Sequence, residues 1–213
     1  MYIKFENVSK KFKQEEVLVN INFKIDKGKT YGFVGRNGSG KTVIFKLLSG
    51  LILPTSGNIY VNDVNLTKTK QFPQNMGILI ETPGFIPHYS GLKNLKILND
   101  LSDFKVSVQK IKESMSLVGL DPENRKHLRT YSLGMKQKLG IAQAIMNEPE
   151  LLILDEPMNG LDEDSVLKMR EFFNSLKQKQ VTTLLASHNK EDISSLCDKI
   201  FYIKSGNISE NDI

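Results

Sequence analysis

One segment decides the fold of this chain: Gly35-Arg36-Asn37-Gly38-Ser39-Gly40-Lys41-Thr42. It follows the apolar run 30–34 directly and precedes a stretch with the pattern of a helix. Glycines let successive backbone N–H groups approach an anion, and the helix presents its positive N-terminal end to the same place. We expect Lys41 to reach the β- and γ-phosphates and the Thr42 hydroxyl to ligate Mg²⁺. The pattern therefore predicts a nucleotide-binding loop, with an ordinary glycine turn as the alternative.

The length and composition are those of a folded, water-soluble protein. The chain has 213 residues, of which 39% are hydrophobic and 25% charged, so it can form one domain or one domain with an insertion. No apolar run approaches the roughly 18 residues that span a bilayer. The N-terminus lacks the basic region and apolar core of a secretory signal. These features predict a cytoplasmic protein.

The single cysteine and the net charge narrow the possible classes further. Cys197 has no partner for an intramolecular disulfide, and we expect it to act as a small core hydrophobe. The formal net charge of +5 is compatible with nucleic acid or with an anionic membrane surface. The lysines are scattered rather than gathered into a run, so no nucleic acid partner is expected and proximity to an anionic leaflet is favoured.

The order of apolar patterns predicts an α/β fold with a helical insertion. Short apolar runs that alternate with helices indicate a parallel sheet covered on both faces. Between residues 83 and 149 the apolar residues instead recur at helical spacing, for example at Val108, Ile111 and Met115. We expect a single domain, 1–213, with a core of residues 1–82 and 150–205, a helical subdomain 83–149 and a short C-terminal end 206–213. The expected strands are 2–8, 17–25, 30–34, 57–61, 76–80, 151–154, 181–186 and 200–203, and the expected core helices are 40–48 and 162–179.

Two carboxylates follow the apolar run 151–154. Sheets of this class bind ligands at the carboxyl ends of their strands, which is where Asp155 and Glu156 are expected to lie. Asp155 is suited to hold the hydration shell of Mg²⁺. Glu156 is suited to polarise the water that attacks the γ-phosphate. The alternative is an acidic turn after a core strand.

Two further segments are compatible with contacts to phosphate. Ser132 and Gly134 precede a helical pattern, and a serine hydroxyl, a glycine backbone and a helix N-terminus can together hold an anion. An ordinary capped helix is the alternative. His188 follows the expected strand 181–186, where its imidazole can bond the γ-phosphate or play a structural role.

Taken together, this order of motifs resembles the ATP-binding subunits of ABC transporters over nearly the whole chain. The resemblance implies a P-loop NTPase (RecA-like) core with an antiparallel β portion and an inserted α-helical subdomain. It also implies a head-to-tail dimer in which Ser132 and Gly134 of one protomer close on the γ-phosphate held by residues 35–42 of the other. The loop Asn159–Asp162 resembles the D-loop between the two sites; alternatively, it is a turn in which Asp162 caps the next helix.

The same resemblance assigns roles and partners. Lys41, Glu156 and His188 become the catalytic residues of an ATPase that powers a separate membrane permease from the inner face of the cell membrane. A coupling surface is expected near Glu81 and Phe85. Phe12 occupies the position of the aromatic residue that stacks on adenine; a core position between strands is the alternative.

Two positions depart from the usual family pattern. The signature is Tyr131-Ser-Leu-Gly-Met135, which keeps the serine and the second glycine of Leu-Ser-Gly-Gly-Gln. Glu81 stands where the family usually has a Gln that touches Mg²⁺. We expect Glu81 to sense the metal and transmit the nucleotide state, with a solvated glutamate at a strand end as the alternative.

The tract 78–85 and the segment 90–95 resemble the ATPase subunits of bacterial exporters for bacitracin, lantibiotics and similar antimicrobial peptides. This resemblance implies export that provides self-immunity or resistance. The alternative function is an ATP-binding regulatory or non-transport module that acts on another macromolecule.

Overall fold

The computed structural model describes residues 1–212, so Ile213 of the expected C-terminal end lies outside the described residues. The strands are β1 (Ile3–Phe12), β2 (Glu15–Ile25), β3 (Thr30–Val34), β4 (Ser56–Val61), β5 (Val64–Asn65), β6 (Met76–Leu79), β7 (Leu151–Asp155), β8 (Thr182–Ala186), β9 (Lys199–Lys204) and β10 (Asn207–Asp212). The α-helices are α1 (Lys41–Leu48), α2 (Leu66–Thr69), α3 (Gly91–Leu101), α4 (Val108–Leu117), α5 (Leu133–Ile145), α6 (Glu163–Gln178) and α7 (Lys190–Leu196). A short 3₁₀-helix, η1 (Leu128–Thr130), precedes α5.

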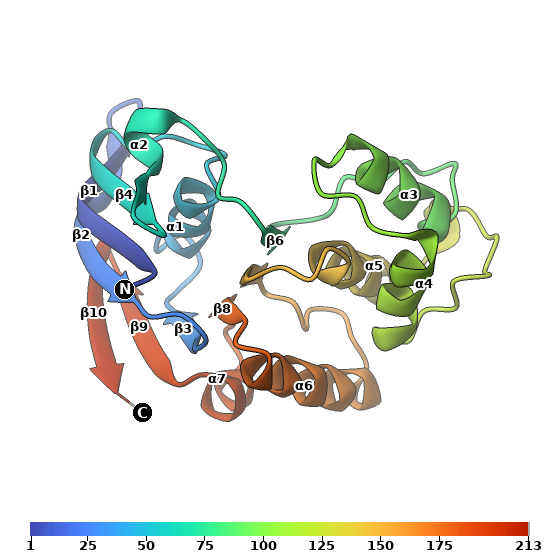
Figure 1. The fold of residues 1–213 in the computed structure, drawn as a ribbon. Coiled ribbons are helices and arrows are strands. Elements are labelled where there is room, and N and C mark those ends of the chain that lie inside the picture. The colour runs from blue at the N-terminus through green and yellow to red at the C-terminus, as the bar shows by residue number, and fades with distance from the viewer. Residues whose placement is uncertain (213) are drawn as a thin grey trace.

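The strands form two sheets that meet beside α1 (Figure 1). The antiparallel sheet has the order β2-β1-β4-β5, and the larger sheet has the order β10-β9-β3-β8-β7-β6. In the larger sheet β9, β3, β8, β7 and β6 run parallel, and only β10 pairs antiparallel to its neighbour. The expected fold class, with its antiparallel β portion, is therefore confirmed.

Alternate residues of the central strands face two separate cores. Leu151 and Ile153 of β7 pack in a core with α1 and the antiparallel sheet. Leu152 and Leu154 pack on the opposite face, in a core with α5 and α6. All four side chains are fully buried. A strand that is apolar at every position is stable here because both of its faces are covered, as the sequence predicted.

Three helices, α3, α4 and α5, lie in the chain between β6 and β7 and stand to one side of the sheets (Figure 1). Each begins at a serine whose hydroxyl accepts a backbone N–H bond: Ser90, Ser107 and Ser132. Such caps satisfy N–H groups that have no partner within the helix. The segment attaches to the sheet through α5, because a Cβ at Gly77 of β6 would lie 1.8 Å from the carbonyl oxygen of Ala144.

Several short elements were not expected from the sequence. They are α2, β5, α7 and β10. Residues 207–212, expected as part of a short C-terminal end, pair with β9 as an edge strand of the larger sheet. The turn at Asn62 and Asp63 joins β4 to β5 with positive φ at both residues, a conformation that Asn and Asp tolerate.

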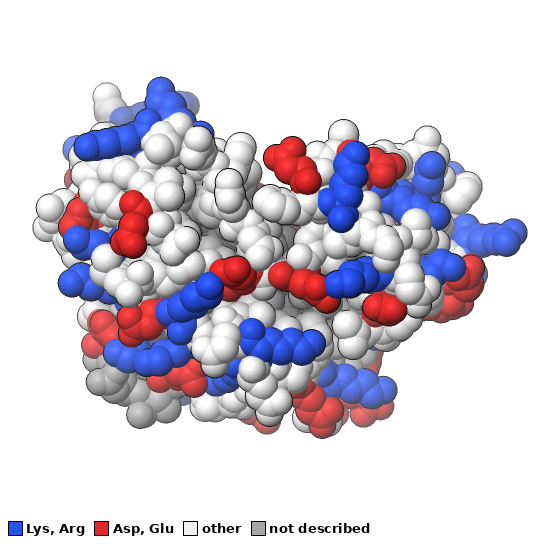
Figure 2. Space-filling model, in the orientation of Figure 1, with Lys and Arg blue, Asp and Glu red and all other residues white. Residues whose placement is uncertain are grey.

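The surface carries both signs of charge. On the face shown in Figure 2, Lys and Arg are interspersed with Asp and Glu over the sheets and over the helical segment. Within residues 1–212, no helix is both long enough and apolar enough to cross a membrane.

Candidate nucleotide site

The loop 35–40 connects β3 to α1 at the carboxyl edge of the parallel sheet. Lys41 is only 7% exposed, and its ammonium donates to the carbonyl oxygens of Gly35 at 2.7 Å and Arg36 at 3.3 Å. The buried Ser39 hydroxyl has no hydrogen-bond partner within the structure. An anionic ligand fits this place, because it would neutralise the buried ammonium and accept a hydrogen bond from the unsatisfied hydroxyl. Arg36, Asn37 and Gly38 are exposed at the loop tip.

Thr42 and Asp155 meet although they lie 113 positions apart in the chain. The Thr42 hydroxyl donates to the Asp155 carboxylate over 2.6 Å. Thr42 stands in the first turn of α1 and Asp155 at the end of β7, so the pairing of β3 and β7 with β8 brings them together. The result is a pair of hard oxygen ligands beside the loop.

Glu156 and His188 form a second pair at the same edge. The Nδ1 atom of His188 lies 2.8 Å from the Glu156 carboxylate, whose side chain is 21% exposed. Glu156 has a φ of 51°, a left-handed conformation that is costly for a residue with a side chain. Its backbone N–H is nevertheless held by the carbonyl oxygen of Ala186 at 2.9 Å, so the turn out of β7 is fixed by β8.

One cleft joins most of the predicted residues. It encloses about 860 Å³ and is lined by Phe12, Val17, Asn37, Gly38, Ser39, Gly40, Lys41, Thr42, Val43, Glu81, Thr82, Leu133, Gln137, Asp155, Glu156 and Asn159. Phe12 is 44% exposed at the end of β1, with the Lys10 ammonium 4.9 Å from its ring centroid. The alternative that Phe12 is a core residue is therefore wrong. Its ring is available for stacking at the edge of the cleft.

Glu81 faces the same cleft but already has a partner. Its carboxylate lies 2.6 Å from the ammonium of Lys46, which is one turn beyond Thr42 on α1. Glu81 also takes a left-handed φ, of 59°, just after β6. The side chain is 62% exposed, as a solvated glutamate would be, yet it is ion-paired. The sequence argument missed Lys46, although its four-residue spacing from Thr42 on a helix was a usable signal.

Leu133 is the residue of the signature segment that lines this cleft, whereas Ser132 and Gly134 lie outside it. Ser132 is exposed and caps α5 by accepting the Met135 N–H over 3.2 Å. A Cβ at Gly134 would lie 2.6 Å from the carbonyl oxygen of Gly160, so α5 begins in close contact with the loop 159–162. Gln137, which sequence reasoning also missed, donates to the carbonyl oxygens of Glu156 and Pro157 at 3.0 and 3.2 Å. The signature helix thus contacts two parts of the connection between β7 and α6, residues 156–157 and Gly160.

Asp162 caps the N-terminus of α6, as the alternative interpretation of the loop 159–162 predicted. Its carboxylate accepts the Ser165 N–H at 2.9 Å and the Ser165 hydroxyl at 2.8 Å. These bonds favour the charged form, so they hold the pKa of Asp162 below its ordinary value. Like Ser132 and Gly134, Asp162 is absent from the lining of the chain's own cleft.

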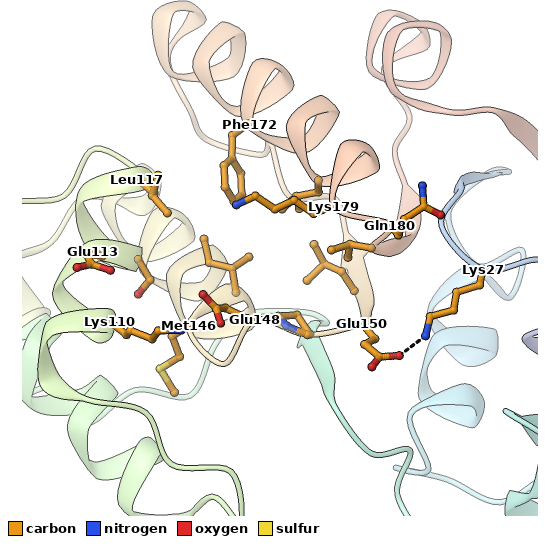
Figure 3. Close-up of a pocket in the computed structure, with 16 residues that line it drawn as sticks. Lys27, Lys110, Glu113, Leu117, Met146, Glu148, Glu150, Phe172, Lys179 and Gln180 are labelled. Atoms are coloured by element: carbon orange, nitrogen blue, oxygen red, sulfur yellow. Dashed lines mark hydrogen bonds and ion pairs between the residues drawn. The ribbon is translucent and has the colours of Figure 1, made fainter.

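A second cavity, of about 400 Å³, lies near the amino ends of β7 and β8, away from the phosphate loop (Figure 3). Apolar side chains of α4, α5 and α6 line it, together with the ion pairs Lys27–Glu150 and Lys110–Glu148. These two lysines are already engaged, and no predicted site residue lines the cavity. The nucleotide site is therefore assigned to the cleft at the loop 35–42.

The fold and the cleft define a P-loop ATPase with a helical segment inserted between two strands of its parallel sheet. Residues 18–159, more than half of the chain, match the family model described as "ABC transporter". The chain belongs to this family, and it is an ATP-binding and ATP-hydrolysing subunit of the ABC type.

Curated relatives are similar over nearly the whole chain. The uncharacterized ABC transporter ATP-binding protein YybJ of Bacillus subtilis (strain 168) is 41% identical over 97% of this chain and 94% of its own length. The bacitracin transport ATP-binding protein BcrA of Enterococcus faecalis is 41% identical over 98% of this chain and 68% of its own length. The lantibiotic transport ATP-binding protein SrtF of Streptococcus pyogenes is 36% identical over 97% of this chain and 88% of its own length.

Solved structures support the fold. A dimeric ATP-binding cassette in a post-hydrolysis state with ADP and Pi superposes with a TM-score of 0.89 at 22% identity, covering 99% of this chain and 98% of that one. An ATP-binding subunit of an ABC transporter superposes with a TM-score of 0.88 at 25% identity, covering 100% of this chain and 90% of that one. The family model and the curated relatives confirm the expected family, and the solved structures confirm its fold.

Proposed function

We propose that this chain is the motor subunit of an exporter of antimicrobial peptides or related compounds, and that it provides self-immunity or resistance. The observation that carries the motor role is the complete set of groups at one sheet edge: Lys41, the Thr42–Asp155 pair and the Glu156–His188 pair. The similarity to relatives named for bacitracin and lantibiotic transport supports the substrate class.

Within the site, each group takes a distinct role. Lys41, Ser39 and the backbone N–H groups of residues 35–40 bind the phosphates, and the Phe12 ring stacks on adenine. Thr42 and Asp155 hold Mg²⁺, which binds few protein oxygens because phosphates and waters complete its shell. When bound, the ion neutralises charge that develops on the phosphates. Glu81 lines the same cleft as the loop, and we assign it the sensing of that ion.

Hydrolysis depends on the second pair. The Glu156 carboxylate polarises the attacking water, and His188 holds the γ-phosphate while keeping Glu156 oriented. The 2.8 Å contact between them supports this division of roles.

We further propose a homodimer arranged head to tail. Ser132, Gly134 and Asp162 lie outside the chain's own cleft, and Ser132 is exposed at the N-terminus of α5. A helix N-terminus with an exposed hydroxyl suits the γ-phosphate held by another protomer. Because Gly134 contacts Gly160, closure on a partner would also be transmitted to the loop 159–162.

We also propose that the permease partner docks near Glu81 and Phe85 and that the chain lies at the inner face of the cell membrane. A groove there is lined by Lys46, Leu51, residues 78–84 and Gln143. Leu51 is 51% exposed, and Ile86 nearby in the sequence is 42% exposed. Exposed apolar side chains beside a nucleotide-sensing residue suit a docking segment whose position changes with nucleotide state.

Glu156→Gln tests the motor role. We expect the variant to bind ATP and to accumulate as a dimer in size-exclusion chromatography, with turnover reduced at least about 100-fold because the general base is lost. Glu171→Gln, at an exposed position on α6, is the matched control. Normal turnover of Glu156→Gln would contradict the assigned role, and low turnover of the unmutated chain would favour a regulatory module.

Growth inhibition tests the substrate class. In a strain that carries the chain with its permease, Glu156→Gln should lower the bacitracin or lantibiotic concentration that stops growth. Unchanged sensitivity to both classes, with ATPase activity of the unmutated chain intact, would reject the peptide substrates and leave the motor role standing.

A further inference from the structure

A buried ion pair links two helices behind the nucleotide site. Arg170 of α6 donates from Nη2 and Nε to one carboxylate oxygen of Asp192 on α7, at 2.6 and 2.9 Å. Arg170 is 9% exposed and Asp192 is 1% exposed, beside apolar side chains of the second core. Removing two charges from water costs several kcal/mol per ion, and a pair of apolar residues could fill the same space without that cost. Stability alone therefore does not account for the pair.

The other carboxylate oxygen of Asp192 points toward the end of β8. It accepts the hydroxyl of Ser187 over 3.0 Å. Ser187 is 3% exposed, and its oxygen in turn accepts the backbone N–H of Asn189 over 3.1 Å. Ser187 and Asn189 flank His188, so this single hydroxyl fixes the backbone on both sides of the histidine.

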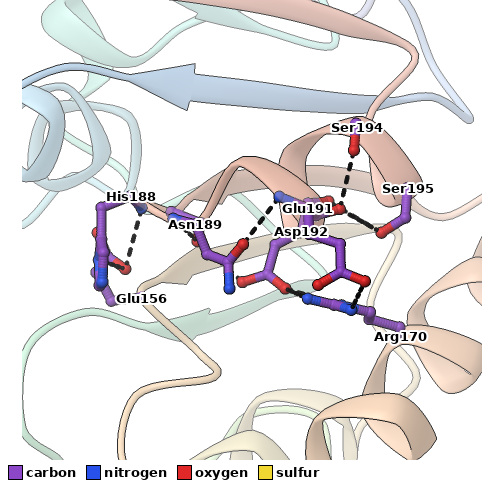
Figure 4. Close-up of polar contacts among 9 residues, drawn as sticks. Glu156, Arg170, His188, Asn189, Glu191, Asp192, Ser194 and Ser195 are labelled. Carbon is purple, nitrogen blue, oxygen red and sulfur yellow. Dashed lines mark hydrogen bonds and ion pairs between the residues drawn. The ribbon is translucent and has the colours of Figure 1, made fainter.

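His188 has little else to hold it. Its side chain is 69% exposed, and within residues 1–212 its hydrogen bonds, from Nδ1 and from the backbone N–H, both reach Glu156. An exposed ring that lacks surrounding packing takes its direction from the backbone that carries it. Figure 4 shows the contact of His188 with Glu156 on one side and the contact of Arg170 with Asp192 on the other.

We propose that Arg170, Asp192 and Ser187 are positioning residues that set the direction of His188 toward Glu156. Both Arg170 donors that bond Asp192 share one carboxylate oxygen, which leaves the second oxygen directed at Ser187. Glu191 forms a second ion pair with the Arg170 guanidinium, with its carboxylate 2.8 Å from Nη1. Directional bonds of this kind fix an angle that apolar packing does not. The inference rests on the proposed roles of Glu156 and His188.

Ser187→Ala removes the link at its smallest point. We expect kcat for ATP to fall between about 10- and 100-fold, the effect of a misplaced reacting group, with KM changed less than about twofold. Ser187→Thr keeps the hydroxyl and should restore most of kcat. Ser194→Ala, which loses a hydroxyl bonded to the carbonyl of Glu191 on the same helix, is the control and should leave kcat unchanged. A Ser187→Ala variant with normal kcat would overturn the inference.

A double-mutant cycle separates this inference from the proposed function. If Ser187 acts through His188, adding Ser187→Ala to His188→Ala should cause no further loss of kcat. Additive losses would mean that Ser187 acts elsewhere, and would overturn the positioning role alone. A His188→Ala variant with normal turnover would overturn the proposed role of His188 and the inference together.

The ion pair is tested by replacing both partners. Arg170→Met combined with Asp192→Leu fills the site with apolar volume, so we expect the melting temperature to stay near that of the unmutated chain. We expect kcat to fall as in Ser187→Ala, because the anchor of the serine is gone. If the double variant keeps a normal kcat as well as a normal melting temperature, the pair is purely structural and the inference is overturned.

Discussion

At the scale of the residue, two glutamates stand in costly conformations at the nucleotide edge. Glu81 and Glu156 follow the parallel strands β6 and β7, and both take a left-handed φ, at 59° and 51°. Such conformations persist when surrounding bonds over-determine them, and they concentrate at functional sites. Here they turn the chain sharply after each strand and direct both carboxylates to one cleft.

Lys41 provides a test of the phosphate loop. The carbonyl oxygens of the loop position the buried Lys41 ammonium, which is the cation assigned to the phosphates. Lys41→Met removes this cation and should lower ATP affinity by at least about 100-fold, corresponding to ~2.7 kcal/mol, while the chain stays folded. Titration calorimetry measures the affinity and circular dichroism the fold. Lys24→Met, at an exposed position of β2, should bind ATP normally. Unchanged affinity in Lys41→Met would refute the assigned phosphate site.

Glu81 carries a separate expectation. Its ion pair with Lys46 ties the sensor position to the helix that follows the phosphate loop. Glu81→Ala should raise the Mg²⁺ concentration for half-maximal ATP turnover several-fold, because the proposed metal sensor loses its carboxylate. Glu113→Ala, at an exposed position on α4, is the control. If Glu81→Ala leaves both Mg²⁺ dependence and transport coupling untouched, the sensor role fails.

At the scale of the element, the helical segment packs on the sheet through a close approach between β6 and α5. A side chain at Gly77 would meet the backbone of α5 at Ala144, and backbone cannot move aside as a flexible side chain can. The same helix begins against the loop 159–162 and contacts the turn after Asp155 through Gln137. The N-terminal end of α5 therefore contacts the segment that follows β7 at the site, and its C-terminal end contacts β6.

Gly77→Ala should destabilise the chain by about 3 kcal/mol, the upper part of the range for overpacking. Urea denaturation measures the change in the free energy of unfolding. Gly84→Ala is the matched comparison because its Cβ would enter open space, and its unfolding free energy should differ little from that of the unmutated chain. Equal stability of the two variants would show that β6 and α5 are less closely packed than described.

At the scale of the whole molecule, two buried acids couple stability to pH. Burial raises the pKa of the Cys197 thiol from its ordinary value of 9.0 to about 12. Burial, and then the Glu150 carboxylate, raise the pKa of Tyr2 from 10.0 to about 12. The folded state thus keeps protons that the unfolded state releases. The stability from each group is complete below its unfolded pKa and is lost as pH rises toward 12.

The free energy of unfolding should therefore fall between pH 9 and 12, with a slope of up to about 1.4 kcal/mol per pH unit for each group. Urea denaturation across this pH range measures the slope. Tyr2→Phe should reduce the slope of the unfolding free energy against pH above pH 10. A stability that stays constant from pH 9 to 12 would contradict the burial of both groups. The same burial predicts that Cys197 resists alkylation until the chain unfolds.

Much of the fold could be predicted because its signals are local. The wholly apolar strand 151–154 and the largely apolar strand 181–186 indicated a sheet covered on both faces, and helical spacing located the insertion. Short elements such as α7 and β10 carry too few residues for a clear period, so they were missed. The division into core and subdomain, and the roles of the site residues, stay predictions.

The sequence by itself determined the family, the phosphate loop and the residues that follow each strand at the ligand edge, because each of these is written in a short contiguous pattern. Only the tertiary structure decided which of these residues touch: Glu81 with Lys46, Glu156 with His188, and Ser187 with Arg170 through Asp192. Hydrogen bonds act over about 3 Å, and groups from different elements reach that distance only after the strands have aligned and the helices have packed.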